Sequence, residues 1–246
     1  MSDVLRSEWT KIRSVRSTMW LLAATLVAML GLGGLLSAAA VANDGIGLDP
    51  ANASLAGTSI ASILMAVLGV LVISAEYRTG LIRTTLLAVP RRLRMLAGKA
   101  IVLTAVVLTV SLVACFGAFF LGQAIFGGEG TTLGEPGVLR AVVGSALYIT
   151  ACALFGLGLG ALIRHTAGGV VAVFLFIVVL PGMAQLLPGA WGDQVYRFFT
   201  TNAGVQISLT EPLPGQLGPW TGFGVYCAWI AVSLVAAGAL LRRRDA

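Results

Sequence analysis

The chain has 246 residues, of which 58% are hydrophobic and only 11% are charged, and its mean hydropathy is +0.95. A soluble domain carries about 25% charged residues, so this composition excludes an ordinary soluble protein. A helical membrane span needs about 20 apolar residues. The chain therefore holds six spans and leaves no room for a separate globular domain.

Six apolar runs are long enough to cross a membrane, and they predict an all-α membrane protein with one transmembrane domain over residues 1–246. None of the runs contains Asp, Glu, Lys, Arg or His. One such charge at a helix centre would cost about 2.5–3.5 kcal/mol, so nothing opposes insertion. The runs cover residues 20–42, 55–75, 100–126, 141–163, 168–187 and 223–241.

The segment before the first run, SDVLRSEWTKIRSVRSTMW, is typical of a basic amphipathic helix at a membrane surface. Leu5, Trp9 and Ile12 share one helical stripe, and the nearby basic residues fall away from it. The alternative is a charged leader that only sets topology. The small residues SAAAVAND after the first run resemble a signal-peptide cleavage site, but the run exceeds a hydrophobic region of about 7–15 residues.

The distribution of Lys and Arg predicts the orientation. If the N-terminus is cytoplasmic, only Arg140 and Arg197 of the 16 basic residues lie outside. The expectation is a bacterial cell-membrane protein with both termini in the cytoplasm. The acidic residues lean toward the outer segments, which contain Asp44, Asp49, Glu129, Glu135, Asp193 and Glu211.

Several kinds of site have no pattern here. Ion-coupled transporters generally need intramembrane carboxylates, histidines or lysines, and the apolar runs contain none. The only histidine, His165, lies in a short inner turn, and the three cysteines lack metal or disulfide spacing. Lys99 follows Gly98, but the rest of a phosphate-binding loop is missing. We expect no catalytic, metal or cofactor site on this chain. If the protein performs work on a substrate, the energy must therefore come from another polypeptide.

Glycine is abundant, with 31 residues, and Gly156 and Gly160 have the spacing that lets helix backbones approach closely in lipid. Close packing between helices is enough to explain these glycines. Seams between helices that slide during a transport cycle are compatible with the same pattern.

The connector between the second and third runs, SAEYRTGLIRTTLLAVPRR, combines arginines with apolar residues. Ile82, Leu86 and Val89 follow helical spacing, and Pro90 ends that pattern. Attraction of arginines to an anionic leaflet explains part of the charge. A short cytoplasmic helix with an exposed apolar face is also typical of a docking element for a soluble partner.

The chain resembles the permease subunits of type-two ABC exporters, especially their actinobacterial branch. The resemblance rests on LRSEWTKIRSVRSTMW, EYRTGLIRTTLLAVPRR, FFTTNAGVQ and the closing LLRRRDA. It implies an ABCG-like fold, with an elbow helix over residues 1–18, a cytoplasmic coupling segment over 76–99 and an outer re-entrant loop over 188–222. Where the family often has proline before Asn-Ala-Gly, this chain has Thr200 and Thr201.

The same resemblance implies the partners: two copies of a cytoplasmic ATPase subunit that carries ATP and Mg²⁺, a second permease copy or paralogue, and the lipid bilayer, with no nucleic acid. It assigns ATPase coupling to the segment after the second span. The elbow-helix residues are Leu5, Glu8, Trp9, Lys11, Ile12 and Arg13, and the coupling residues are Glu76, Tyr77, Arg78, Thr79, Gly80, Ile82, Arg83, Leu86 and Val89.

Three functions remain open from the sequence. The first is ATP-driven export of an apolar or amphipathic molecule by alternating access, with the first, second and fifth spans lining the path by resemblance. The second is a non-transporting scaffold or sensor that anchors an ATPase. The third is a passive channel.

Overall fold

The computed structural model describes residues 2–43, 48–80 and 92–243, and these residues contain helices and no strand. The expected all-α fold is therefore confirmed. The elements in chain order are α1 (Ser2–Ser14), α2 (Arg16–Ala42), α3 (Pro50–Ser54), α4 (Thr58–Thr79), α6 (Arg92–Phe126), the 3₁₀ turn η1 (Gly127–Glu129), α7 (Val138–Ile163), α8 (Thr166–Phe174), the π-helical turn η2 (Leu175–Val179), α9 (Leu180–Ala184), α10 (Gly189–Phe198), α11 (Thr200–Gly204), the 3₁₀ turn η3 (Val205–Ser208) and α12 (Pro219–Arg243).

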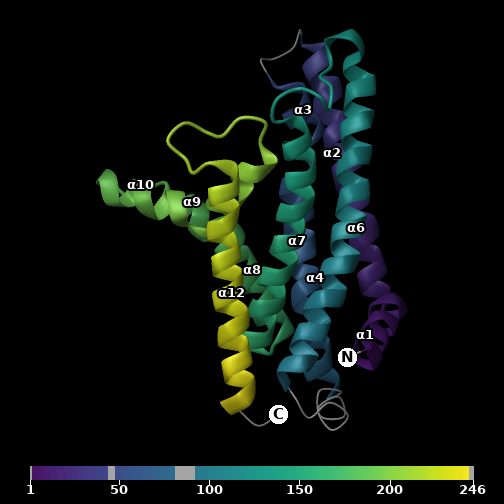
Figure 1. The fold of residues 1–246 in the computed structure, drawn as a ribbon, viewed down its shortest axis with the longest axis vertical. Helices are drawn as coiled ribbons and strands as arrows, with labels where there is room; N and C mark the ends of the chain where they lie inside the picture. Colours follow the sequence, from purple (N-terminus) through teal and green to yellow (C-terminus); the bar gives the residue numbers. More distant parts are fainter. Residues whose placement is uncertain (1, 44–47, 81–91, 244–246) are drawn as a thin grey trace.

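Six stretches of helix in the described residues are long and apolar enough to span a membrane, as expected. They are Arg16–Ala42, Pro50–Thr79, Leu93–Glu129, Val138–Ile163, Thr166–Ala184 and Pro219–Leu241. In Figure 1 they run roughly along the long axis, and α1 and the end of α12 lie at the same end of the bundle. We call this the basal end.

Two helices extend past the apolar runs that predicted them. Helix α4 continues to Thr79 and α6 begins at Arg92, so Glu76 and Lys99 belong to spanning helices rather than to a connector. Both are buried. The apolar runs themselves carry no charge, but the helices bury one charged side chain directly after the second run and one directly before the third.

Helix α7 forms the centre of the bundle and packs closely against α4. Gly69 of α4 and Gly156 of α7 make this approach possible. A Cβ atom on Gly69 would collide with the Ala153 carbonyl oxygen, and one on Gly156 with that of Ala66. The glycine spacing in the sequence thus marks a true helix–helix seam.

The fifth span is interrupted between α8 and α9. One π-helical turn occupies Leu175–Val179, and Pro181 follows in the first turn of α9. Pro181 has no N–H, so it cannot donate to the carbonyl groups four or five residues earlier. Those groups belong to Ile177 and Phe176.

The two carbonyl groups receive hydrogen bonds from the segment that returns toward the bundle. Thr200 Oγ1 donates to the Phe176 carbonyl at 2.9 Å, and Thr201 Oγ1 donates to that of Ile177 at 3.1 Å. Both threonines are buried. The Thr-Thr pair, where the resemblance leads one to expect proline, therefore fastens α11 to the kink in the fifth span.

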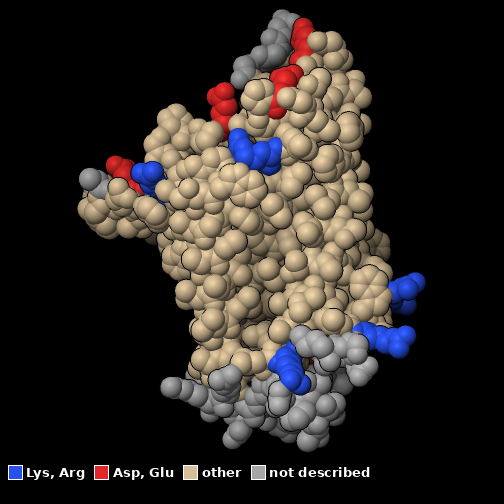
Figure 2. All heavy atoms as spheres, viewed as in Figure 1, with Lys and Arg blue, Asp and Glu red and all other residues tan. Residues whose placement is uncertain are grey.

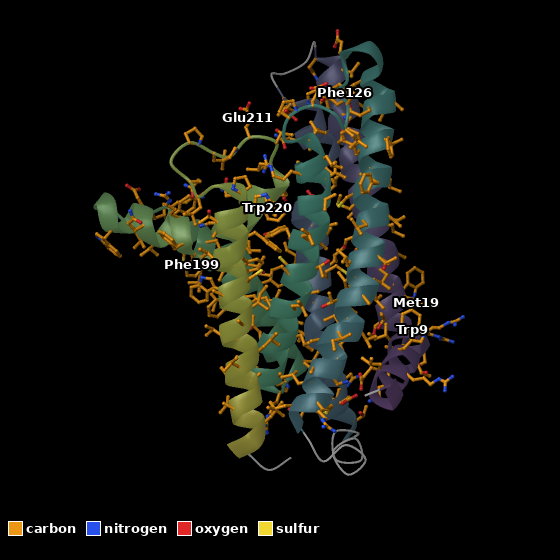
Figure 3. The ribbon with its side chains drawn as sticks, viewed as in Figure 1. Trp9, Met19, Phe126, Phe199, Glu211 and Trp220 are labelled. Atoms are coloured by element: carbon orange, nitrogen blue, oxygen red, sulfur yellow. The ribbon has the colours of Figure 1, made fainter. Side chains whose placement is uncertain are left out.

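Helix α10 projects sideways from the bundle at the end of this kinked span (Figure 1). Its Trp191, Val195 and Phe198 side chains are exposed. In Figure 3, Phe199 lies near this projection, Trp220 marks the start of α12, and Phe126 lies at the end of the bundle opposite Trp9 and Met19. The expected re-entrant segment thus contains helices, and α11 packs against α12.

Candidate functional site

Helix α1 packs against the basal part of the bundle and buries side chains there. Its Glu8 and Ile12 side chains are buried, and its main helical neighbour is α6. Trp9 is 51% exposed and points away from the bundle with Met19 (Figure 3). The stripe expected from sequence is therefore split, because Ile12 faces protein while Trp9 faces outward.

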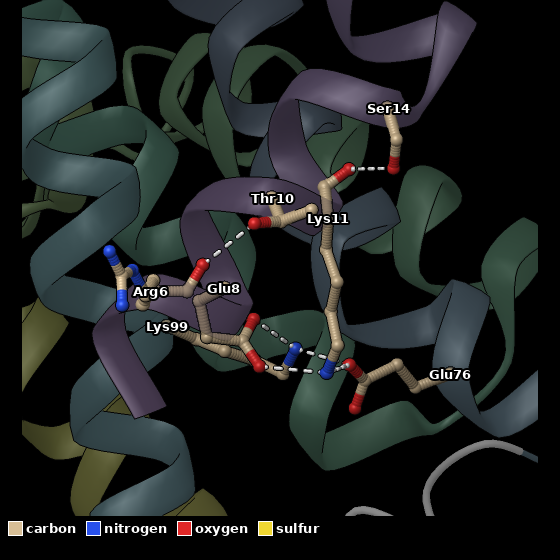
Figure 4. Close-up of polar contacts among 7 residues, drawn as sticks. All are labelled: Arg6, Glu8, Thr10, Lys11, Ser14, Glu76 and Lys99. Carbon is tan, nitrogen blue, oxygen red and sulfur yellow. Dashed lines mark hydrogen bonds and ion pairs between the residues drawn. The ribbon is translucent and has the colours of Figure 1, made fainter. Parts of the chain in front are cut away.

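Four charged side chains meet where α1, α4 and α6 converge: Glu8, Lys11, Glu76 and Lys99 (Figure 4). We call them the ion-pair cluster. Lys99 Nζ lies 2.7 Å from Glu8 Oε2 and 2.6 Å from Glu76 Oε1. Lys11 Nζ lies 2.9 Å from Glu8 Oε1 and 2.7 Å from Glu76 Oε1. Each lysine therefore bridges the same two helices, α1 and α4.

Burial makes the pairing within the cluster necessary. The exposed fractions are 1% for Lys99, 2% for Glu8 and 5% for Glu76. Removing a charge from water costs several kcal/mol unless opposite charges and hydrogen bonds compensate. Two acids and two lysines give the cluster no net charge, so each buried ion has its counter-ion.

Lys11 forms the more exposed edge of the cluster. Burial acts to lower its pKa, but hydrogen bonds and charge interactions with Glu76 and Glu8 outweigh that effect, so the pKa rises above 10.5. A raised pKa means that the charged lysine is favoured in the folded protein. Its contribution to stability is fully present below pH 10.5 and is lost only as the pH rises through the folded-state pKa.

The C-terminal end of α4 also contacts the turn between α7 and α8, in addition to the ion-pair cluster. The Arg164 guanidinium lies 5.3 Å from the centre of the Tyr77 ring, which is within cation–π range. Arg164 Nη2 also donates to the Leu240 carbonyl of α12 at 3.4 Å. Thr166 Oγ1 donates to Ser74 Oγ at 3.0 Å. The last two turns of α4 are thus tied to α1, α6 and the α7–α8 turn.

The predicted coupling residues fall into three groups. Glu76 is buried in the ion-pair cluster, and Tyr77 stacks with Arg164. Arg78 and Thr79 are exposed, and Gly80 ends α4 in the left-handed conformation at φ 72°. The remaining predicted residues lie outside the described residues: Ile82, Arg83, Leu86 and Val89.

The predicted elbow residues are all described. Leu5 and Lys11 are partly buried, and Arg13 is exposed like the neighbouring Arg6. The structure thus joins two predicted groups, since the elbow residues Glu8 and Lys11 contact the coupling residue Glu76 directly or through Lys99.

Lys99 is the cluster member to which sequence reasoning gave no role beyond topology. A usable signal was present: Glu76 follows one apolar run and Lys99 precedes the next, so opposite charges lie at one level of two antiparallel helices. Glu8 supplies the second acid. This pairing is missed if each helix is assumed to end where its apolar run ends, because both residues then fall in the connector.

The other expected polar features have local roles. His165 Nδ1 accepts from the Gly168 N–H at 3.2 Å and so caps the start of α8. Among the described residues no group of three His, Cys, Asp or Glu side chains is placed to hold a metal ion.

Comparison with known families identifies the chain's class. Residues 4–183 match the family described as ABC-2 family transporter protein, which is well over half of the chain. The chain therefore belongs to the ABC-2 transporter membrane family, which is generally the non-catalytic membrane component that works with an ATPase. No curated protein matches the chain in sequence.

Proposed function

We propose that this protein is the permease subunit of an ATP-driven exporter of the actinobacterial branch, and that a separate cytoplasmic ATPase powers it. Two ATPase copies would bind ATP and Mg²⁺, and two permease chains, identical or paralogous, would form the pathway. The observation that carries the proposal is the convergence of α1, α6 and the α7–α8 turn on the last two turns of α4.

The charge distribution supports a cytoplasmic basal end in the bacterial cell membrane. In Figure 2 the visible Asp and Glu all lie in the upper half, together with some Lys and Arg, whereas the visible charges of the lower half are all Lys and Arg. Cytoplasmic segments of membrane proteins carry an excess of Lys and Arg. With six spans and α1 and α12 ending at one end, both termini would be cytoplasmic.

In this proposal, force enters through the segment that follows α4. The docking helix expected over residues 82–89 would contact the ATPase, and Arg78 and Thr79 are exposed beside it in sequence. Glu76 acts from inside the protein, because its buried carboxylate joins α4 to α1 and α6. A movement of the α4 end would therefore carry α1 and the base of α6 with it.

The cargo we infer is an apolar or amphipathic molecule, such as a lipid, a peptide or a lipophilic drug. Buried charged side chains in the described spans occur at the basal end. The remaining buried polar residues of the spans are chiefly Ser and Thr. Alternating access between inward- and outward-facing states would then move the cargo without a charged binding site.

The test uses the full chain and the ATPase that copurifies with it, reconstituted into proteoliposomes with rhodamine 6G as a lipophilic probe. Glu76→Ala should reduce ATP-driven dye transport at least tenfold, while the variant still inserts and binds the ATPase. Ile82→Asp should also insert normally and lose ATP-driven transport, because it places a charge on the apolar face of the expected docking helix. Glu211→Ala, the same substitution at an exposed glutamate outside the cluster and the predicted site residues, is the matched control.

The alternatives predict other results. A scaffold or sensor would bind the ATPase, but dye would leave its ATP hydrolysis unchanged. A passive channel would release dye without nucleotide or ATPase. Full transport by both Glu76→Ala and Ile82→Asp would overturn the coupling assignment.

A further inference from the structure

A cavity of about 300 Å³ lies beside the ion-pair cluster, between α1, the start of α2 and the last turns of α4. Its volume is at the lower end of the range of about 300–1,000 Å³ found for ligand pockets. In the proposed function the ion-pair cluster links three helices, and the cavity has no role.

One wall of the cavity is apolar. Ile12 of α1 and Leu71, Val72 and Ala75 of α4 contribute to it. These α4 residues belong to the last part of the second apolar run. The cavity therefore lies where hydrocarbon contact ends and charged residues begin, which is the level of a lipid's glycerol and headgroup.

The rest of the cavity lining has charges of both signs. Lys11, with 35% of its side chain exposed, and the exposed Arg78 offer cationic donors. Glu76 offers an acceptor: its Oε1 takes both lysines, whereas Oε2 is buried without a hydrogen-bond partner among the described residues. Figure 4 shows this second oxygen turned away from the two lysine ammonium groups.

A buried carboxylate oxygen without a hydrogen-bond donor is energetically costly. A ligand that donates to it while offering an anion to Lys11 and Arg78 would meet both needs. Phospholipid headgroups with an ammonium or hydroxyl group next to the phosphate have this chemistry. Phosphatidylcholine has the phosphate but no donor.

We propose that this cavity binds one glycerophospholipid of the ethanolamine or glycerol headgroup type from the leaflet at the basal end. An acyl chain contacts Leu71 and Val72, and the phosphate contacts Lys11 or Arg78. The headgroup donor contacts Glu76 Oε2 after the carboxylate rotates toward the cavity, because this oxygen is fully covered by protein in the present structure. The lipid then completes the contact between α1 and α4. This site needs neither nucleotide nor ATPase.

The experiment is native mass spectrometry of the delipidated full-length chain after addition of palmitoyl-oleoyl phosphatidylethanolamine, phosphatidylglycerol or phosphatidylcholine. We expect one tightly retained molecule of either donor-bearing lipid, at least about tenfold preferred over phosphatidylcholine. That ratio corresponds to one charge-assisted hydrogen bond. Glycerol 3-phosphate in a separate arm distinguishes a lipid site from a site for free phosphate.

Leu71→Trp tests the location, because the larger side chain fills the cavity and should abolish retention. Leu64→Trp is the matched control: it lies two turns away on the same face of α4 and does not line the cavity. Equal retention by these two variants would overturn the site. Equal retention of all three lipids by the wild-type chain would overturn the headgroup assignment, a result that does not depend on either variant folding. Retention of glycerol 3-phosphate alone would make it an anion site instead.

Discussion

At the residue scale, Lys99 depends on its surroundings more than any other charged side chain described. It is 1% exposed, and its ammonium group contacts carboxylates from two different helices. Such a cluster is weak evidence for net stability, since apolar residues of similar volume could fill the space. The cluster instead holds three helices together. If α1 or the base of α6 moved away from the end of α4, a buried charge would lose its counter-ion.

Lys99→Met should destabilise the protein by about 3 kcal/mol, because Glu8 and Glu76 would keep their buried charges with only Lys11 as partner. Thermal unfolding of the purified full chain measures the change. Arg94→Met on the same helix removes an exposed charge and should alter stability by less than about 0.5 kcal/mol. Equal melting temperatures for the two variants would contradict the assigned role of the cluster.

Gly156 is a second residue whose importance comes from its contacts. Gly156→Ala would place a methyl group against the Ala66 carbonyl of α4 and should cost at least about 2 kcal/mol. Gly224→Ala on α12 has no neighbour within 4 Å, so the better helix propensity should leave stability unchanged or raise it by up to about 1 kcal/mol. Thermal unfolding again compares them, and similar losses for both would show that the α4–α7 seam is not closely packed.

At the element scale, the kink between α8 and α9 depends on a segment far along the chain. Thr200 and Thr201 satisfy the carbonyl groups that Pro181 leaves without donors. The hydroxyl groups therefore fasten α11 to the kinked part of the fifth span. Asn202 adds a hydrogen bond from its side-chain amide to the Pro181 carbonyl at 3.3 Å.

Replacing both threonines by valine keeps their shape but leaves two carbonyl groups unpaired, which should cost about 2–4 kcal/mol. In a Pro181→Ala background the cost should fall, because alanine at this position restores one backbone N–H. A double-mutant cycle by thermal unfolding measures this coupling. Thr109→Val is the control, since its hydroxyl bonds only the carbonyl of Ala105 in its own helix. Additive effects of the threonine and proline changes would exclude the proposed pairing.

At the scale of the whole molecule, the charge asymmetry predicts that α1 lies on the cytoplasmic side. A membrane-impermeant maleimide should label the Thr132→Cys variant in intact cells. It should label the Ser7→Cys variant only after the cells are permeabilised. Both positions are exposed, at opposite ends of the bundle. Cys227 is exposed and is replaced by Ser in both variants, whereas Cys115 and Cys152 are buried and can stay. Labelling of Ser7→Cys in intact cells would invert the proposed topology.

Much of the architecture could be predicted from local pattern. Six apolar runs predict six spans because each run is long enough by itself to satisfy its backbone in lipid. The amphipathic first segment predicts α1, and the spacing of Gly156 and Gly160 predicts a close helix contact. The ends of the helices were harder to predict from the sequence, because an α-helix continues into a charged segment when the charges find partners in the fold.

The sequence by itself determined the class of the protein, the number of spans and the asymmetry of charge, because hydrophobicity and charge are properties of each segment alone. Only the tertiary structure decided that Glu8 and Lys11 meet Glu76 and Lys99, and that Thr200 and Thr201 complete the kink at Pro181. These contacts join residues far apart in the chain. Their formation depends on how neighbouring helices rotate and overlap, which no single segment specifies.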